Sequence, residues 1–152
     1  MPSAKCRVPG ARSHFDVVPV QSMETTTTLY HFSMKLTDLL IHKQSIELAT
    51  ALYHDVRSWP HFDRNTLGVQ LVRAADSVPS NIAEGYGRYS RSDAKRFLLY
   101  ARGSLAEVES HVRLACQRGL ITNERLDELL AIIEPLMIRI KAFGRTLSDT
   151  RS

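Results

Sequence analysis

The chain has 152 residues, a formal net charge of +4 and a composition that is 43% hydrophobic and 24% charged. These values are typical of a single soluble globular domain. Cys6 and Cys116 are too few for a disulfide scaffold or a cysteine-rich zinc module. No apolar run approaches the ~18–20 residues of a membrane span, and no apolar segment near the N-terminus indicates a secretory signal. We therefore expect a cytoplasmic protein without a membrane-bound part.

Residues 1–34 differ in composition from the rest of the chain. They contain three prolines and a run of four threonines, without an amphipathic pattern. Such a segment buries too little apolar surface to offset the entropy of chain ordering. We expect a disordered or loosely attached tail there, and a start codon assigned too far upstream is another explanation for it. The folded domain is then residues 35–148, and residues 149–152 should fray.

A first helix is predicted over residues 37–58, with Thr37 or Asp38 as its N-terminal cap. Its end is expected at Trp59, because a residue before proline is forced out of the helical region. The buried stripe follows helical spacing and consists of Ile41, Ser45, Leu48, Leu52 and Val56.

A second helix is predicted to start at a cap formed by Asp63 or Asn65. Its stripe is Leu67, Leu71, Ala75, Val78 and Ile82. Pro79 lies inside this stripe, so the helix either stops near Asp76 and restarts at Pro79, or continues with a kink. The apolar spacing runs through the proline without a phase jump, which favours the kink. Glycine with a positive φ is expected to end the helix at residues 85–87.

A third helix has the most regular pattern of the chain. Ser90 followed by Asp93 predicts its N-terminal cap, and Gly119 its end. A strict alternation of three- and four-residue steps, the period of a helix bundle, connects Ala94, Leu98, Ala101, Leu105, Val108, Val112 and Ala115.

A fourth helix is predicted to begin at Thr122 and to bend at Pro135. Its expected stripe is Leu126, Leu130, Ile133, Met137, Ile140 and Leu147. Four amphipathic helices joined by short loops, with no strand pattern, predict an all-α fold: an antiparallel up-down-up-down four-helix bundle.

No arrangement of residues indicates catalysis or metal binding. A di-iron bundle needs Glu-x-x-His on two helices, whereas the residues three positions after Glu107 and Glu109 are Ser110 and Val112. The glycine pair at residues 85–87 follows a predicted helix rather than a strand, which argues against a dinucleotide loop. We expect no catalytic residue, no metal and no cofactor.

Basic residues gather where the second helix ends and the third begins. The group comprises Arg88, Arg91, Lys95, Arg96 and Arg102, interleaved with Tyr86, Tyr89 and Tyr100. Helical spacing places Arg91, Lys95 and Arg102 on one face beside the core stripe. Cations with nearby aromatic rings suit phosphate backbones and stacked bases. The alternative is an ordinary solvated bundle face. Anion binding by the free amides at the start of the third helix is a further alternative.

The segment around Pro79 is unusually polar for a bundle helix. Serine, proline and asparagine are poor helix formers, and here they concentrate around the expected kink. We predict an oligomer or partner interface, or a ligand notch, formed by Ser77, Pro79, Ser80, Asn81 and Glu84. Alternatively, Asn81 and Glu84 satisfy backbone groups that Pro79 leaves without partners.

Several strings of this sequence closely resemble one bacterial family. They are residues 70–75 (Gln-Leu-Val-Arg-Ala-Ala), residues 77–85 (Ser-Val-Pro-Ser-Asn-Ile-Ala-Glu-Gly) and residues 101–107 (Ala-Arg-Gly-Ser-Leu-Ala-Glu). The family is that of the four-helix bundle proteins encoded in intervening sequences of 23S ribosomal RNA genes. The resemblance covers about residues 36–145. The tail before residue 35 and Pro135 depart from the family's pattern.

The resemblance implies a basic bundle that assembles as a homopentamer and has no established enzymatic activity. The family is similar to accessory proteins of diversity-generating retroelements, which are thought to bind nucleic acid and a reverse transcriptase. We therefore expect a homo-oligomer that binds RNA or DNA, with a reverse transcriptase-like protein or ribosomal RNA as a possible partner. A protein–protein adaptor or structural oligomer is the alternative, and a small enzyme is a remote third.

Overall fold

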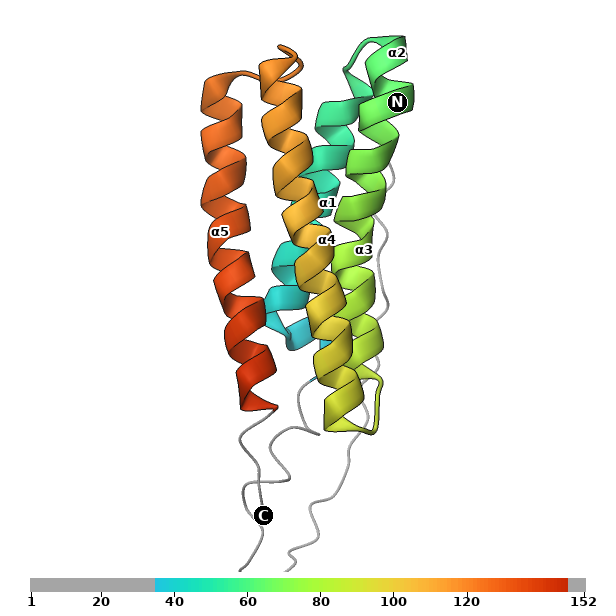
Figure 1. Cartoon of the computed structure of the whole chain (residues 1–152), viewed down its shortest axis with the longest axis vertical. Coiled ribbons are helices and arrows are strands. Elements are labelled where there is room, and N and C mark those ends of the chain that lie inside the picture. The colour runs from blue at the N-terminus through green and yellow to red at the C-terminus, as the bar shows by residue number, and fades with distance from the viewer. Residues whose placement is uncertain (1–34, 148–152) are drawn as a thin grey trace, which may run out of the picture.

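The structure, a computed structural model, describes residues 35–147, and every regular element in that range is helical (Figure 1). A 3-10 turn at Leu36–Asp38 precedes α1 (Leu40–Arg57). The short α2 (His61–Asp63) and a π-helical segment, η2 (Arg64–Gly68), lead without a break into α3 (Val69–Tyr86). The two longest helices follow and are α4 (Arg91–Gln117) and α5 (Asn123–Thr146).

The four long helices form a bundle in which each helix packs against the next and α5 packs against α1 (Figure 1). Successive helices run in opposite directions, as short connections require. The predicted all-α up-down-up-down bundle is therefore confirmed. The tail predicted over residues 1–34 and the fraying predicted for residues 149–152 lie outside the described residues.

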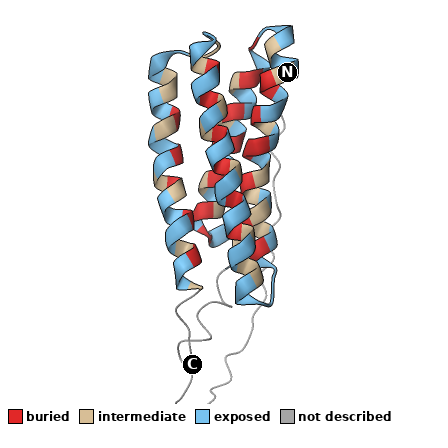
Figure 2. Ribbon diagram, in the orientation of Figure 1, coloured by how far each residue is buried: buried red, intermediate tan, exposed pale blue. Residues whose placement is uncertain are grey.

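The core consists of the apolar stripes that face the bundle axis (Figure 2). Every residue of the stripes predicted for the first two helices is buried. In α4 the stripe is buried from Leu98 to Ala115, while Ala94 is only partly covered. Ser45, the one buried polar residue in the described core, donates its hydroxyl proton to the His42 carbonyl at 2.7 Å. Helical periodicity therefore located most of the core correctly.

The stripe predicted for α5 is shifted by one position in part of its length. Leu129 and Leu136 are fully buried, whereas their neighbours Leu130 and Met137 are only partly buried. Two adjacent apolar pairs leave two possible rotations of the helix about its axis, and packing against α1 and α4 selects between them.

Helix starts are predicted correctly for α4 and α5. The Ser90 hydroxyl accepts the Asp93 amide at 3.4 Å, and the Thr122 hydroxyl accepts the Arg125 amide at 3.1 Å. Gly119 has a φ of 71°, the left-handed conformation expected where α4 ends.

The caps predicted for the first two helices are wrong. Leu39 precedes α1 and makes no side-chain cap, because a 3-10 turn occupies the residues expected to supply one. The second helical stretch starts directly after Pro60, so Asp63 and Asn65 lie inside it. There the Asn65 amide donates to the His61 carbonyl at 2.8 Å, one turn back, instead of capping a helix start.

Both internal prolines lie within continuous helices. α3 continues through Pro79 and α5 through Pro135, so the alternative in which the second helix stops near Asp76 is excluded. Near Pro79, the Asn81 amide donates to the Ser77 carbonyl at 2.8 Å.

Gly85 has a different role from the predicted one. It lies inside α3 and is buried, and Gly87, after the helix, has a φ of −75° rather than a positive value. A Cβ at position 85 would lie 3.0 Å from the Ala94 carbonyl oxygen and 3.1 Å from Phe97 Cβ. Gly85 therefore permits the close approach of α3 to the first turns of α4.

Gly85→Ala should lower the free energy of unfolding by about 1–3 kcal/mol, because the added methyl group meets a backbone carbonyl that cannot move cheaply. Gly103→Ala on α4 is the matched control, since a methyl group added there would have no atom within 4 Å outside its own helical turn. It should raise the free energy of unfolding by up to about 1 kcal/mol through helix propensity. Urea unfolding followed by circular dichroism measures both. Equal effects of the two substitutions would contradict the close approach.

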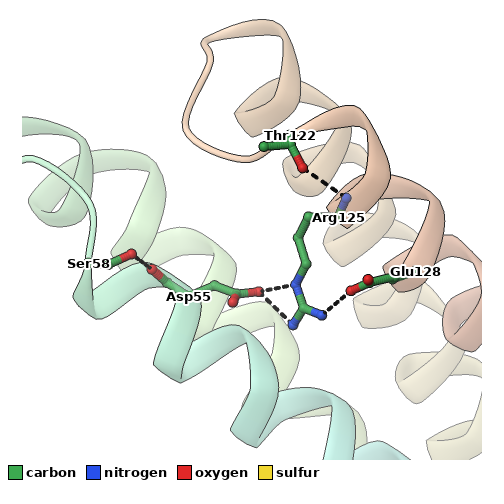
Figure 3. A network of polar contacts seen from close by, with 5 residues as sticks. All are labelled: Asp55, Ser58, Thr122, Arg125 and Glu128. Atoms are coloured by element: carbon green, nitrogen blue, oxygen red, sulfur yellow. Dashed lines mark hydrogen bonds and ion pairs between the residues drawn. The ribbon is translucent and has the colours of Figure 1, made fainter.

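A polar network connects α1 to α5 at the end of the bundle that holds α2 (Figure 3). The Arg125 guanidinium donates to the Asp55 carboxylate at 3.0 Å and to Glu128 at 2.7 Å. The hydrogen bond to Glu128 and then the contacts with Asp55 hold the pKa of Arg125 above its usual value. Farther along the same pair of helices, Arg139 donates to the Gln44 side-chain oxygen at 3.0 Å. These bonds connect the first and last helices of the bundle.

Arg125→Ala and Asp55→Ala should each lower the free energy of unfolding by about 1 kcal/mol, because the pair is partly buried and joins two helices. A double-mutant cycle in urea should give a coupling energy of about 0.5–1 kcal/mol. The control is the pair Arg113–Glu109, exposed on α4 alone, which should couple by about 0.3 kcal/mol. A coupling at Arg125 no larger than the control's would show that the network does not stabilise the bundle.

Candidate nucleic-acid interface

The five predicted basic residues separate into two groups. Arg88 forms an ion pair with Glu84, and its guanidinium lies 4.7 Å from the centre of the Phe97 ring. Arg96 forms an ion pair with Asp93 at 2.9 Å. These two charges are therefore balanced by carboxylates on the same or the preceding helix.

The second group comprises Arg91, Lys95 and Arg102. All three are exposed on one side of α4, and Lys95 lies at the border of a groove. Their helical spacing of four and seven residues keeps them on one face, as predicted. Lys95 and Arg102 border this groove between α4 and α5, and Arg91 borders a pocket at the end of the bundle. The three cations therefore form a row along one face of α4.

The groove between α4 and α5 has a volume of about 200 Å³, and we call it the basic groove. Four cationic side chains line it: Lys95 and Arg102 from α4, and Lys141 and Arg145 from α5. The other lining residues are Leu98, Leu99, Ile140 and Gly144. No carboxylate is among these lining residues, so the groove combines an apolar floor with a positively charged border.

The antiparallel pairing of α4 and α5 produces this concentration of charge. The second half of α5 contains Arg139, Lys141 and Arg145 and no acidic residue after Glu134, whereas its first half holds the helix's carboxylates. The first third of α4 is basic, with Asp93 as its one acidic residue. Because the helices run in opposite directions, their two basic halves lie side by side.

Helix stability explains only part of this distribution. Cations near the C-terminus of α5 interact favourably with the helix dipole, but Arg91 and Lys95 lie near the N-terminus of α4, where the dipole is positive. Sequence reasoning missed Lys141 and Arg145 because it treated the helices one at a time. The signal was the charge asymmetry of the last helix, combined with the antiparallel topology.

A larger pocket lies where α3 ends, α4 begins and α5 ends, and we call it the end pocket. Its volume is about 490 Å³. The residues that line it are Ile82, Gly85, Tyr86, Gly87, Arg88, Tyr89, Arg91, Ala94, Leu98, Phe143 and Leu147. Leu98 also lines the basic groove, so the two sites adjoin on α4. Of the tyrosines predicted to accompany the basic residues, Tyr86 and Tyr89 line this pocket, whereas Tyr100 contacts Phe97 edge-on at 5.6 Å.

The residues predicted as an oligomer or partner interface remain apart from the basic groove. Ser77 and Ser80 donate hydroxyl protons to carbonyls one turn back on α3, each at 2.8 Å. Ser77, Pro79 and Asn81 are partly buried, and Ser80 and Glu84 are exposed. Glu84 belongs to the ion pair with Arg88. The predicted interface thus remains a prediction, and most of its polar groups have partners within α3.

Two further findings concern the described residues alone. Within residues 35–147, no group of three or more His, Cys, Asp or Glu side chains is placed to hold a metal ion. None of the helices in this part of the chain combines the length and apolar character needed to cross a bilayer.

The sequence profile of the 23S rRNA-intervening sequence proteins matches residues 37–142. The chain belongs to this family. The match includes the whole of α1, α3 and α4 and most of α5, and it ends between Lys141 and Arg145 of the basic groove. No curated protein matches the chain.

Among solved structures, this family member is similar to a protein of unknown function from the S23 ribosomal protein family of Bacteroides thetaiotaomicron. The two share 20% sequence identity with a TM-score of 0.63. The match covers 69% of this chain and 98% of the other. At this identity the likeness supports the fold alone.

Proposed function

We propose that this family member is a non-enzymatic, homo-oligomeric accessory protein that binds the backbone of RNA or DNA. The observation that carries the proposal is the basic groove, where Lys95, Arg102, Lys141 and Arg145 line one site without a carboxylate. A reverse transcriptase-like protein or ribosomal RNA is the partner class that the family suggests.

The row of cations on α4 suits a polyanion better than a small anion. Arg91 extends the row of cations on α4 beyond the groove, so the positive surface is a track and not a point. A phosphate backbone presents charges at regular intervals and releases counterions when it meets such a track. Four neutralised phosphates correspond to a slope of log K against log salt of about −3 on a single strand.

Assembly would strengthen this binding. Ile138 on α5 is 68% exposed and is not among the residues that line the basic groove, so this large apolar side chain is available for a contact between copies. A homopentamer, as the family resemblance implies, would repeat the basic groove around an axis. Weak single contacts then combine into avid binding, which compensates for a net charge of only +4 per chain.

A protein–protein adaptor without a nucleic-acid role is the second candidate. It would use the partly exposed segment of α3 around Pro79, which lies outside the basic groove. In that case, replacing the groove cations by alanine would leave capture of the partner unchanged.

Lys141→Ala/Arg145→Ala should weaken binding of labelled RNA at least tenfold at low salt, because two of the groove's four cations are lost. It should also reduce the salt slope by about 1–1.5. Fluorescence anisotropy at a series of salt concentrations measures both quantities.

The matched control is Arg64→Ala/Arg118→Ala, which removes the same charge from two exposed arginines at the opposite end of the bundle. Its affinity and slope should remain close to those of the parent protein. Equal losses in the two variants would reduce the proposal to a non-specific charge effect. Absence of binding by the parent protein at low salt would refute it.

Native mass measurement at micromolar concentration should give a multiple of the 17.2 kDa chain, with five copies expected from the family resemblance. Ile138→Glu should shift the mass toward one copy if exposed apolar residues of α5 form the contact, because a buried carboxylate is costly. A parent protein that remains a monomer would remove assembly from the account.

A further inference from the structure

The end pocket has features that backbone binding does not use. Its floor is apolar, formed by Ile82, Leu98, Phe143 and Leu147 from α3, α4 and the end of α5. A phosphate backbone gains nothing from such a surface. The volume of about 490 Å³ falls within the range of small-molecule sites and is large enough for a planar heterocycle.

Aromatic rings border this apolar floor. Tyr89 lies in the connection between α3 and α4 and is 100% exposed, so it contributes no packing to the fold. Tyr86, in the last turn of α3, is 43% exposed. Solvent-exposed rings beside an apolar pocket are the groups on which single-stranded nucleic acids stack their bases.

The end pocket lies at one end of the row of cations on α4. Arg91 borders the pocket, and Lys95, one turn along α4, borders the basic groove. From Arg91 to Arg102 the helix rises by about 16 Å, which spans several nucleotides of an extended strand. Arg88 also borders the pocket, but its charge is balanced by Glu84, so Arg91 supplies the positive charge there.

We propose that the end pocket takes one unpaired base of a single strand whose backbone follows the basic groove. The protein therefore prefers single strands and duplexes with an overhang to blunt duplexes. A blunt duplex keeps its bases stacked inside the helix, so it can use the cations but not the apolar floor. This inference rests on the proposed function and names the form of nucleic acid that the same surface recognises.

The test compares three labelled probes by anisotropy in one buffer: an oligonucleotide without secondary structure, a blunt duplex, and that duplex with a short single-stranded overhang. The overhang probe should bind on the order of tenfold more tightly than the blunt duplex, the effect of one stacked base. Tyr89→Ala should weaken this preference severalfold and leave binding of the blunt duplex unchanged. Because Tyr89 is fully exposed, the variant should keep the circular dichroism spectrum of the parent protein.

Phe62→Ala is the matched control, since Phe62 is an aromatic residue that is 74% exposed at the opposite end of the bundle. It should retain the preference for the overhang. A 2-aminopurine base at the end of the overhang reports stacking directly: the parent protein and Phe62→Ala should quench its fluorescence equally, and Tyr89→Ala should quench it less.

The outcomes separate the two proposals. Equal affinity for blunt and overhang duplexes, or an overhang preference that Tyr89→Ala leaves unchanged, would overturn the single-strand inference and leave backbone binding in place. Failure to bind any of the three probes at low salt would refute the proposed function itself, and the inference with it.

Discussion

The antiparallel packing of α4 against α5 brings the residues of the candidate site together. Leu98 and Ile140 occupy the seam between the two helices and also line the floor of the basic groove. Residues that hold the bundle together thus set the distance between the cations on its surface. A rotation of either helix about its axis would separate Lys95 and Arg102 from Lys141 and Arg145. The hydrophobic core therefore determines the electrostatics of the surface.

Close approach of α3 to α4 supplies the second part of the arrangement. Gly85 lets the end of α3 lie against Ala94 and Phe97, and this contact positions the connection that contains Tyr89 and leads to Arg91. Gly85 also lines the end pocket, so one residue takes part both in the contact between α3 and α4 and in the pocket.

Cationic side chains gather in the basic groove. Like charges repel, and the cations near the start of α4 also oppose the helix dipole. The protein balances Arg88 and Arg96 with neighbouring carboxylates but places none in the lining of the basic groove. At the opposite end of the bundle, carboxylates and arginines pair between helices, as at Arg125. The two ends therefore differ: one holds an ion pair between helices, and the other holds cations with no carboxylate in the lining of the basic groove.

The sequence predicts the helices, most of their buried stripes and the caps at Ser90 and Thr122, because these depend on local spacing and hydrogen bonding. It also identified the cations of α4, whose shared face follows from helical geometry. Packing against the neighbouring helices selects the rotation of α5 that buries Leu129 and Leu136, since two neighbouring apolar pairs satisfy the same period. Likewise, the close approach that Gly85 permits, and the placement of Lys95 and Lys141 in one groove, depend on contacts between helices. Contacts between distant segments depend on packing in three dimensions, which periodicity along one helix does not contain.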